Sequence, residues 1–125
     1  MRFMTIFKPA NFKDMEAGVP PTPENMAAMG QLIGELAQSG ALLLTDGLQK
    51  SAKGARVKQS DGKVTITDGP FTEAKELIGG FAIFELKSKE EAVELTKRFL
   101  SVAGDGEVEI RQMQDRPAFQ AANRP

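Results

Sequence analysis

Short stretches of apolar residues, alternating with polar ones or running together, predict β-strands along much of the chain. The strands are expected over residues 2–8, 41–45, 55–59, 63–67, 77–86 and 107–113. Two longer segments instead carry apolar residues at helical spacing, and they predict helices that begin at Thr22 and Ser88. The segment from Ala10 to Pro21 contains Gly18 and two adjacent prolines, so it is predicted to be a loop.

Both predicted helices have recognisable first turns. Thr22 is a typical N-cap, and Pro23 suits the next position, where no backbone N–H is needed. Ser88 and Glu91 match a capping box, in which the two side chains satisfy backbone groups reciprocally. The buried stripes are expected to consist of Met26, Met29, Ile33, Leu36 and Ala37 in the first helix and Ala92, Val93, Thr96, Phe99 and Leu100 in the second.

Two glycine-containing pairs refine the strand predictions. Asp61-Gly62 is a strong signal for a tight β-hairpin, and a turn at this place sets Val57 opposite Ile66. Gly79-Gly80 stands inside a predicted strand, where glycines mark a bulge or a close approach of two backbones. A phosphate loop is not expected there, because the chain contains no nucleotide-binding motif.

The order of the elements predicts an α+β fold. Strand, helix, strand, a β-hairpin insertion, strand, helix and strand form the ferredoxin-like β-α-β-β-α-β pattern. In this pattern strands 2–8 and 77–86 are central, which agrees with their apolar residues on both faces. Since two helices cover only one face of the sheet, we expect the other face to pack on a second copy in a two-fold homodimer. Residues 1–115 are expected to form a single domain and residues 116–125 a C-terminal tail.

Composition narrows the chemistry. The 125 residues include 16 basic and 17 acidic side chains, for a net charge of −1, so a basic patch for nucleic acid is not expected. Zero Cys and zero His exclude thiolate and imidazole chemistry and the commonest ligands of transition metals, and no metal or cofactor is expected. No segment approaches the roughly 18 apolar residues that a membrane span requires. We therefore expect a cytoplasmic protein that does not contact membranes.

The run from Asp68 to Glu76 combines a Gly-Pro turn with several charged side chains. Asp68-Gly69-Pro70-Phe71, with the residues that follow up to Phe81, resembles the signature of the YCII-related family, and in particular its DGPF branch. The resemblance extends over about residues 1 to 115. It implies a dimeric α+β barrel with a cleft between the sheets. Some relatives are implicated in dehydrohalogenation of aromatic compounds, and others accompany sigma factors. A His-Asp pair proposed as catalytic in the founding branch has no counterpart in a chain without His.

The candidate site residues are the polar positions that match the branch, together with one aromatic residue. The candidate catalytic residues are Asp68, Asp46 and Glu76, and the candidate ligand-binding residues are Arg56, Lys75, Glu73, Phe71 and Lys8. Most of them also have a structural interpretation: the aspartates are common at turns and strand ends, Arg56 suits a salt bridge across the hairpin, and residues 73–76 suit an exposed turn.

Two classes of function remain open. In the first, the dimer is a cofactor-independent enzyme, or a binder, that holds a small organic acid or phenol in the cleft between the sheets. A carboxylate whose pKa is raised by burial would then serve as general base. In the second, the chain is a non-catalytic dimerisation or regulatory module linked to transcription, and the motif only shapes an interface.

Overall fold

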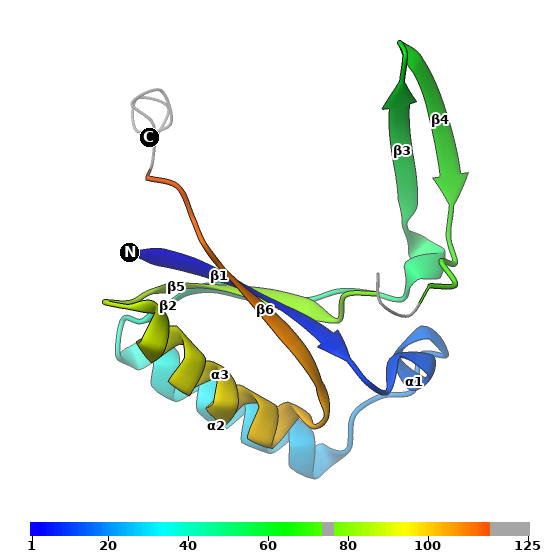
Figure 1. Ribbon diagram of the computed structural model, residues 1–125. Helices are drawn as coiled ribbons and strands as arrows, with labels where there is room; N and C mark the ends of the chain where they lie inside the picture. Colours follow the sequence, from blue (N-terminus) through cyan, green and yellow to red (C-terminus); the bar gives the residue numbers. More distant parts are fainter. Residues whose placement is uncertain (74–76, 116–125) are drawn as a thin grey trace, which may run out of the picture.

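The computed structural model describes residues 1–73 and 77–115. A four-stranded sheet carries a layer of helices on one side, and a separate two-stranded hairpin extends from it (Figure 1). The elements are, in chain order, β1 (Arg2–Pro9), α1 (Phe12–Glu16), α2 (Pro23–Gln38), β2 (Leu42–Gly47), the 3-10 turn η1 (Ser51–Lys53), β3 (Ala55–Ser60), β4 (Lys63–Asp68), β5 (Gly80–Glu85), α3 (Lys89–Ala103) and β6 (Gly106–Gln112).

The four-stranded sheet has the order β2-β5-β1-β6, and every neighbouring pair is antiparallel. The two strands that the sequence placed at the centre, β1 and β5, therefore lie at the centre. Their register sets Phe3 opposite Phe84 and Thr5 opposite Ala82. Because side chains of a strand alternate between the two faces, this register also fixes which residues face the helices.

The core lies between the sheet and the helix layer. Phe3 and Phe84 are buried there against Leu32 and Leu36 of α2 and against Ala92 of α3. The opposite side of the sheet carries no helix of the described residues (Figure 1). We call it the open face, and define it by the apolar residues that alternate with the core-facing ones: Met4, Ile6, Leu44, Phe81 and Ile83.

The helix signals are confirmed, with some differences in the buried stripes. The Thr22 side chain accepts the N–H of Asn25 at 3.2 Å, and the Ser88 side chain accepts the N–H of Glu91 at the same distance. In α2, however, Leu32 is buried, whereas Met26 is 59% exposed and Ala37 is also exposed. The helix is rotated toward Leu32 because Leu32 and Leu36, one turn apart, meet Phe3 and Phe84.

The segment predicted to be one loop, residues 10–21, contains the short helix α1. The Asn11 carbonyl accepts the N–H groups of Asp14 and Met15, which closes a helical turn. Gly18 then takes a φ of 78°, which ends the helix. The loop prediction was wrong here because this turn lacks the apolar spacing of a longer helix.

Two strand boundaries differ from the prediction by more than one residue. β2 continues through Asp46 and Gly47, since both residues pair with β5. β5 begins at Gly80 rather than at residue 77, because its neighbour β1 ends at Pro9, which has no N–H to extend the ladder. The close backbone approach expected at the glycines is confirmed: a Cβ on Gly80 would lie 2.8 Å from the carbonyl oxygen of Asp46.

The hairpin of β3 and β4 has the predicted register, with Val57 opposite Ile66. Its turn residues Asp61 and Gly62 have φ values of 52° and 77°, as the Asp-Gly signal indicates. The hairpin rises from one end of the sheet, on the side opposite to α2 and α3 (Figure 1).

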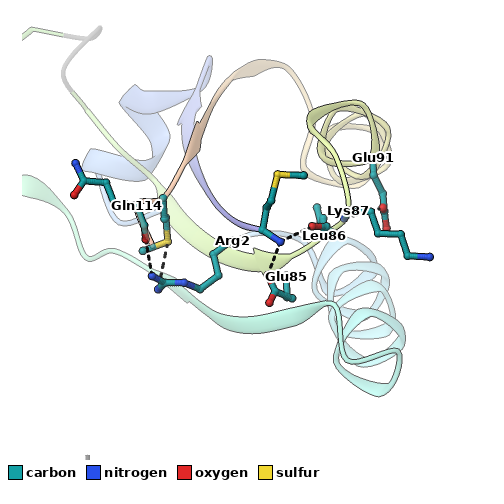
Figure 2. Close-up of polar contacts among 8 residues, drawn as sticks. Arg2, Glu85, Leu86, Lys87, Glu91 and Gln114 are labelled. Atoms are coloured by element: carbon teal, nitrogen blue, oxygen red, sulfur yellow. Dashed lines mark hydrogen bonds and ion pairs between the residues drawn. The ribbon is translucent and has the colours of Figure 1, made fainter. Parts of the chain in front are cut away.

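The N-terminus is held at the other end of the sheet (Figure 2). The Met1 amine donates to the Leu86 carbonyl at 2.9 Å and pairs with the Glu85 carboxylate at 3.1 Å. Arg2 donates to the Gln114 carbonyl at 3.0 Å, and this bond joins β1 to the residues that follow β6. The contacts of Met1 and Arg2 thus link segments that are distant in sequence.

Candidate functional site

A cavity of about 260 Å³ lies between the sheet and the two long helices. It exists because the sheet changes from large to small side chains along its length. Phe3 and Phe84 fill the space at one end, whereas Thr5, Ala82 and Gly80 leave it open further along. α3 adds small side chains at Thr96 and Ala103, and Phe7 packs edge-to-face on Phe99 with ring centroids 5.1 Å apart. Because small side chains of the sheet face small side chains of α3, the two layers leave a space between them that the core does not fill.

The side chains that line the cavity are apolar apart from a few hydroxyl groups. Among the described residues, these hydroxyls belong to Thr5, Thr45 and Thr96. Asp46 also borders the cavity, but its pairing with Phe81 sets its carboxylate on the open face. The hydroxyl of Thr45 donates to the Phe81 carbonyl at 3.0 Å, and that of Thr96 donates to the Ala92 carbonyl at 2.8 Å. A hydroxyl whose proton is already donated keeps lone pairs that accept hydrogen bonds. The cavity therefore offers acceptors in an otherwise apolar space.

One end of the cavity meets a wider and more polar hollow. The two share Phe7, Gly47, Gly79 and Ala103 in their linings. The outer hollow lies between the segment after β1 and the segment after β2, and it includes Lys50. A ligand thus has a route into the cavity at the end where β2 and β5 present glycines.

The DGPF loop, residues 68–71, is anchored on the turn η1. The Ser51 hydroxyl accepts the N–H of Phe71 at 2.9 Å, and the N–H of Gly69 donates to the Gly54 carbonyl at 3.0 Å. Gly69 lies so close to η1 that a Cβ on it would be 1.8 Å from the Ser51 carbonyl oxygen. The glycine of the motif is therefore required by a close approach of two backbones.

Glu16, at the end of α1, holds the other side of the same turn. Its carboxylate accepts the N–H of Ser51 at 2.8 Å and also the Ser51 hydroxyl. The hydrogen bond from the hydroxyl, followed by the bond from the backbone N–H, lowers the pKa of Glu16 below its ordinary value. The positive charge of Lys50 acts in the same direction. One serine thus connects α1 to the DGPF loop.

This arrangement predicts a pH-dependent effect of Glu16→Gln. A carboxyl whose pKa is lowered by folding stabilises the native state above its ordinary pKa of 4.5, and this stabilisation is lost as the pH falls through the lower, native value. At pH 7 the variant should be less stable than the wild type. The difference between their urea midpoints should shrink as the pH is lowered from 5 toward 3.

Ser51→Ala provides the control for this prediction. It removes the hydroxyl that contributes most to lowering the pKa of Glu16. In the Ser51→Ala background, Glu16→Gln should therefore cost less stability at pH 7 than it does in the wild type. An equal cost in both backgrounds, or a cost that does not change with pH, would contradict the coupling.

Phe71 and Arg56 meet at the base of the hairpin. The Arg56 guanidinium lies 3.9 Å from the centroid of the Phe71 ring, a cation–π contact. Both residues were predicted to bind a ligand, and the structure brings them together. The contact joins the beginning of β3 to the last residue of the DGPF loop.

The two candidate aspartates lie on different sheets. Asp46 is in β2 and Asp68 ends β4, and both are exposed. Asp46 borders the cavity with its carboxylate on the open face, and the side chain of Asp68 forms no hydrogen bond or ion pair with any described residue. The catalytic role expected of these two residues stays a prediction.

The remaining candidates are not gathered at the cavity. Lys8 pairs with Glu109 at 3.3 Å and with Glu107 at 3.9 Å, so its ammonium is directed to β6. Glu73 is exposed and is the last residue of the first described segment. Lys75 and Glu76 lie outside the described residues. Among the described candidates, the cavity lining includes Asp46 and does not include Lys8, Arg56, Asp68, Phe71 or Glu73.

Sequence reasoning missed Glu16 and Ser51 as functional positions. Both fall in segments that resemble the family, but neither carries a periodic or catalytic signal of its own. The cavity was missed as well. The sequence feature that could have indicated the cavity is the presence of Thr5 and Thr96, small polar residues at positions that face the core.

Comparisons with known proteins agree with this architecture. A family model, the YCII-related domain, matches residues 1–115. The chain is also similar in structure to 5-chloro-2-hydroxyhydroquinone dehydrochlorinase (TftG) from Burkholderia phenoliruptrix AC1100, solved in complex with 2,5-dihydroxybenzoquinone. The TM-score is 0.50 at 16% identity, over 91% of this chain and 94% of that chain. At this identity the likeness concerns the fold. No curated protein matches the chain.

Two further expectations concern the alternative function and membrane contact. Neither comparison supports the alternative function, a regulatory module linked to sigma factors. In the part of the chain that the structure describes, every helix is too short or too polar to cross a bilayer. The match over residues 1–115, together with the α+β fold, shows that the protein belongs to the YCII-related family.

Proposed function

We propose that this protein binds a small phenol in the cavity between its sheet and its helices. From the motif at residues 68–71 we also infer that it belongs to the DGPF branch of its family. The observation that carries the proposed binding is the 260 Å³ cavity with its apolar walls and hydroxyl acceptors. An apolar cavity of about 150 Å³ is enough to bind benzene in another protein. A ring with one or two substituents therefore has room here.

The polar groups favour a phenol over an organic acid. The hydroxyls of Thr45 and Thr96 already donate their protons to backbone carbonyls. What they offer a ligand is an acceptor, which suits a phenolic O–H. A carboxylate would need donors, and burying its charge without them is costly.

The structural neighbour TftG, a dehydrochlorinase solved with a dihydroxybenzoquinone, supports a ligand of this size and ring chemistry.

We also propose that the protein is a homodimer in which the open faces of two sheets pack together in a barrel. No described segment of the single chain forms a layer over Met4, Ile6, Phe81 and Ile83 on this face, and Leu44 is 49% exposed. A sheet with apolar residues on both faces requires cover on both. The second copy supplies that cover.

Binding of p-cresol tests the proposed site. Isothermal titration should detect p-cresol binding to the wild type, and p-toluate, which has the same ring and methyl group but a carboxylate, should bind at least tenfold more weakly. Ala82→Leu should abolish p-cresol binding, because the larger side chain occupies the cavity that Ala82 lines. Filling a cavity of this kind stabilises a protein by about 1 kcal/mol, so the variant should keep or raise its melting temperature.

Ala27→Leu is the matched control. Ala27 is exposed on α2 and does not line the cavity. This variant should bind p-cresol as the wild type does. Saturable binding that survives Ala82→Leu would place the ligand elsewhere, and an absence of binding to the wild type would refute the proposed function.

A further inference from the structure

The hairpin of β3 and β4 exposes large aliphatic side chains that nothing in the described chain covers. Val57 and Ile66 are each 70% exposed, and Val64 is 55% exposed. Every residue of both strands is exposed. A single two-stranded hairpin is at best marginally stable in water, so an uncovered hairpin of this kind requires a partner.

These aliphatic side chains share one face of the hairpin. Val57 lies opposite Ile66, and Gln59 lies opposite Val64. The alternation of side chains puts these pairs on the same face. The other face pairs Arg56 with Thr67, Lys58 with Thr65 and Ser60 with Lys63. The hairpin is therefore amphipathic, which is the pattern of a strand pair that packs on a surface through one side.

The direction of the hairpin indicates what that surface is. It rises from one end of the four-stranded sheet, on the side of the open face and away from the helices (Figure 1). A body that covers the open face therefore lies alongside the hairpin. The proposed function already assigns that place to a second copy of the chain.

We propose that the hairpin is a clasp, whose apolar face of Val57, Val64 and Ile66 packs on the second copy seated on the open face. This inference rests on the homodimer of the proposed function. Two-fold symmetry gives each copy one clasp on the other, so the two contacts are equivalent. The clasp adds apolar contact at the rim of the interface, beyond the area that the two sheets provide.

The clasp also assigns a role to the DGPF loop. Gly69 packs on the Ser51 carbonyl, the Ser51 hydroxyl holds the N–H of Phe71, and Arg56 stacks on the Phe71 ring. All these contacts lie at the base of the hairpin, where β4 ends. The motif is a positioning element that sets the angle between the hairpin and the sheet.

The double substitution Val57→Thr and Ile66→Thr tests the clasp. Threonine keeps the β-branched shape that strands favour, and both positions are exposed in the single chain, so the fold should tolerate the changes. Sedimentation should show the dimer dissociation constant raised by about tenfold or more. Lys58→Thr, on the polar face of the same strand, is the control and should leave that constant within about twofold of the wild type.

The outcomes separate the clasp from the dimer itself. If the double variant dimerises as tightly as the wild type, while Ile83→Asp on the open face gives monomers, the dimer stands and the clasp is refuted. If the wild type is monomeric at every concentration, the homodimer fails and the clasp fails with it. A weakened dimer in the double variant, with the control unchanged, supports the clasp. Ser51→Ala should then weaken the dimer in the same direction, since it loosens the base of the hairpin.

Discussion

Gly69→Ala should destabilise the protein by about 2–3 kcal/mol, a size typical of overpacking in a closely packed place. The added methyl group would lie 1.8 Å from the carbonyl oxygen of Ser51 and 2.6 Å from its carbonyl carbon. Both are backbone atoms of a turn that Glu16 holds in place, so they cannot move aside as the end of a side chain does. Chemical denaturation measures the loss, and faster hydrogen exchange at the Phe71 amide locates it.

Gly34→Ala is the control for this prediction. Gly34 lies within α2, and a Cβ there would meet nothing within 4 Å. Alanine should stabilise the helix at this position by about 0.5–1 kcal/mol. If Gly69→Ala were as stable as the wild type, the packing of the DGPF loop on η1 would be refuted.

Ile83→Asp should convert the homodimer to monomers, with a dissociation constant at least 100-fold higher, as expected of a residue near the centre of an interface. Ile83 pairs with Met4 on one side and Leu44 on the other, so it lies at the middle of the open face. A carboxylate there loses its water when two apolar faces close, and no partner replaces it. Analytical ultracentrifugation over a range of concentrations measures the change.

Gln31→Asp adds a negative charge to the exposed surface of α2 and serves as the control. It should leave the dimer intact. A wild-type protein that sediments as a single chain at all concentrations, or an Ile83→Asp variant that remains dimeric, would contradict packing through the open face.

Much of the fold follows from local signals in the sequence. The Asp61-Gly62 turn fixed the hairpin register, because positive φ at both residues permits only one tight turn. The apolar residues on both faces of β1 and β5 placed these strands at the centre. Helix starts at Thr22 and Ser88 followed from capping chemistry that acts over three residues.

What the sequence did not reveal depends on contacts between distant segments. Ser51 meets Glu16 across 35 positions and Phe71 across 20, and no local pattern encodes those distances. The burial of Leu32 in place of Met26 depends on how α2 rotates over Phe3. The cavity likewise arises only when the small residues of the sheet and of α3 face one another.

The most direct test of the account is a methyl NMR titration with p-cresol. If the ligand enters the cavity between sheet and helices, the methyl signals of Leu32, Leu95 and Val108, which line it, should shift with one common dissociation constant. The methyl signals of Ile83 and Leu44 on the open face should stay in place. Saturable shifts confined to Ile83 and Leu44 would instead place the ligand between the two sheets and contradict the account.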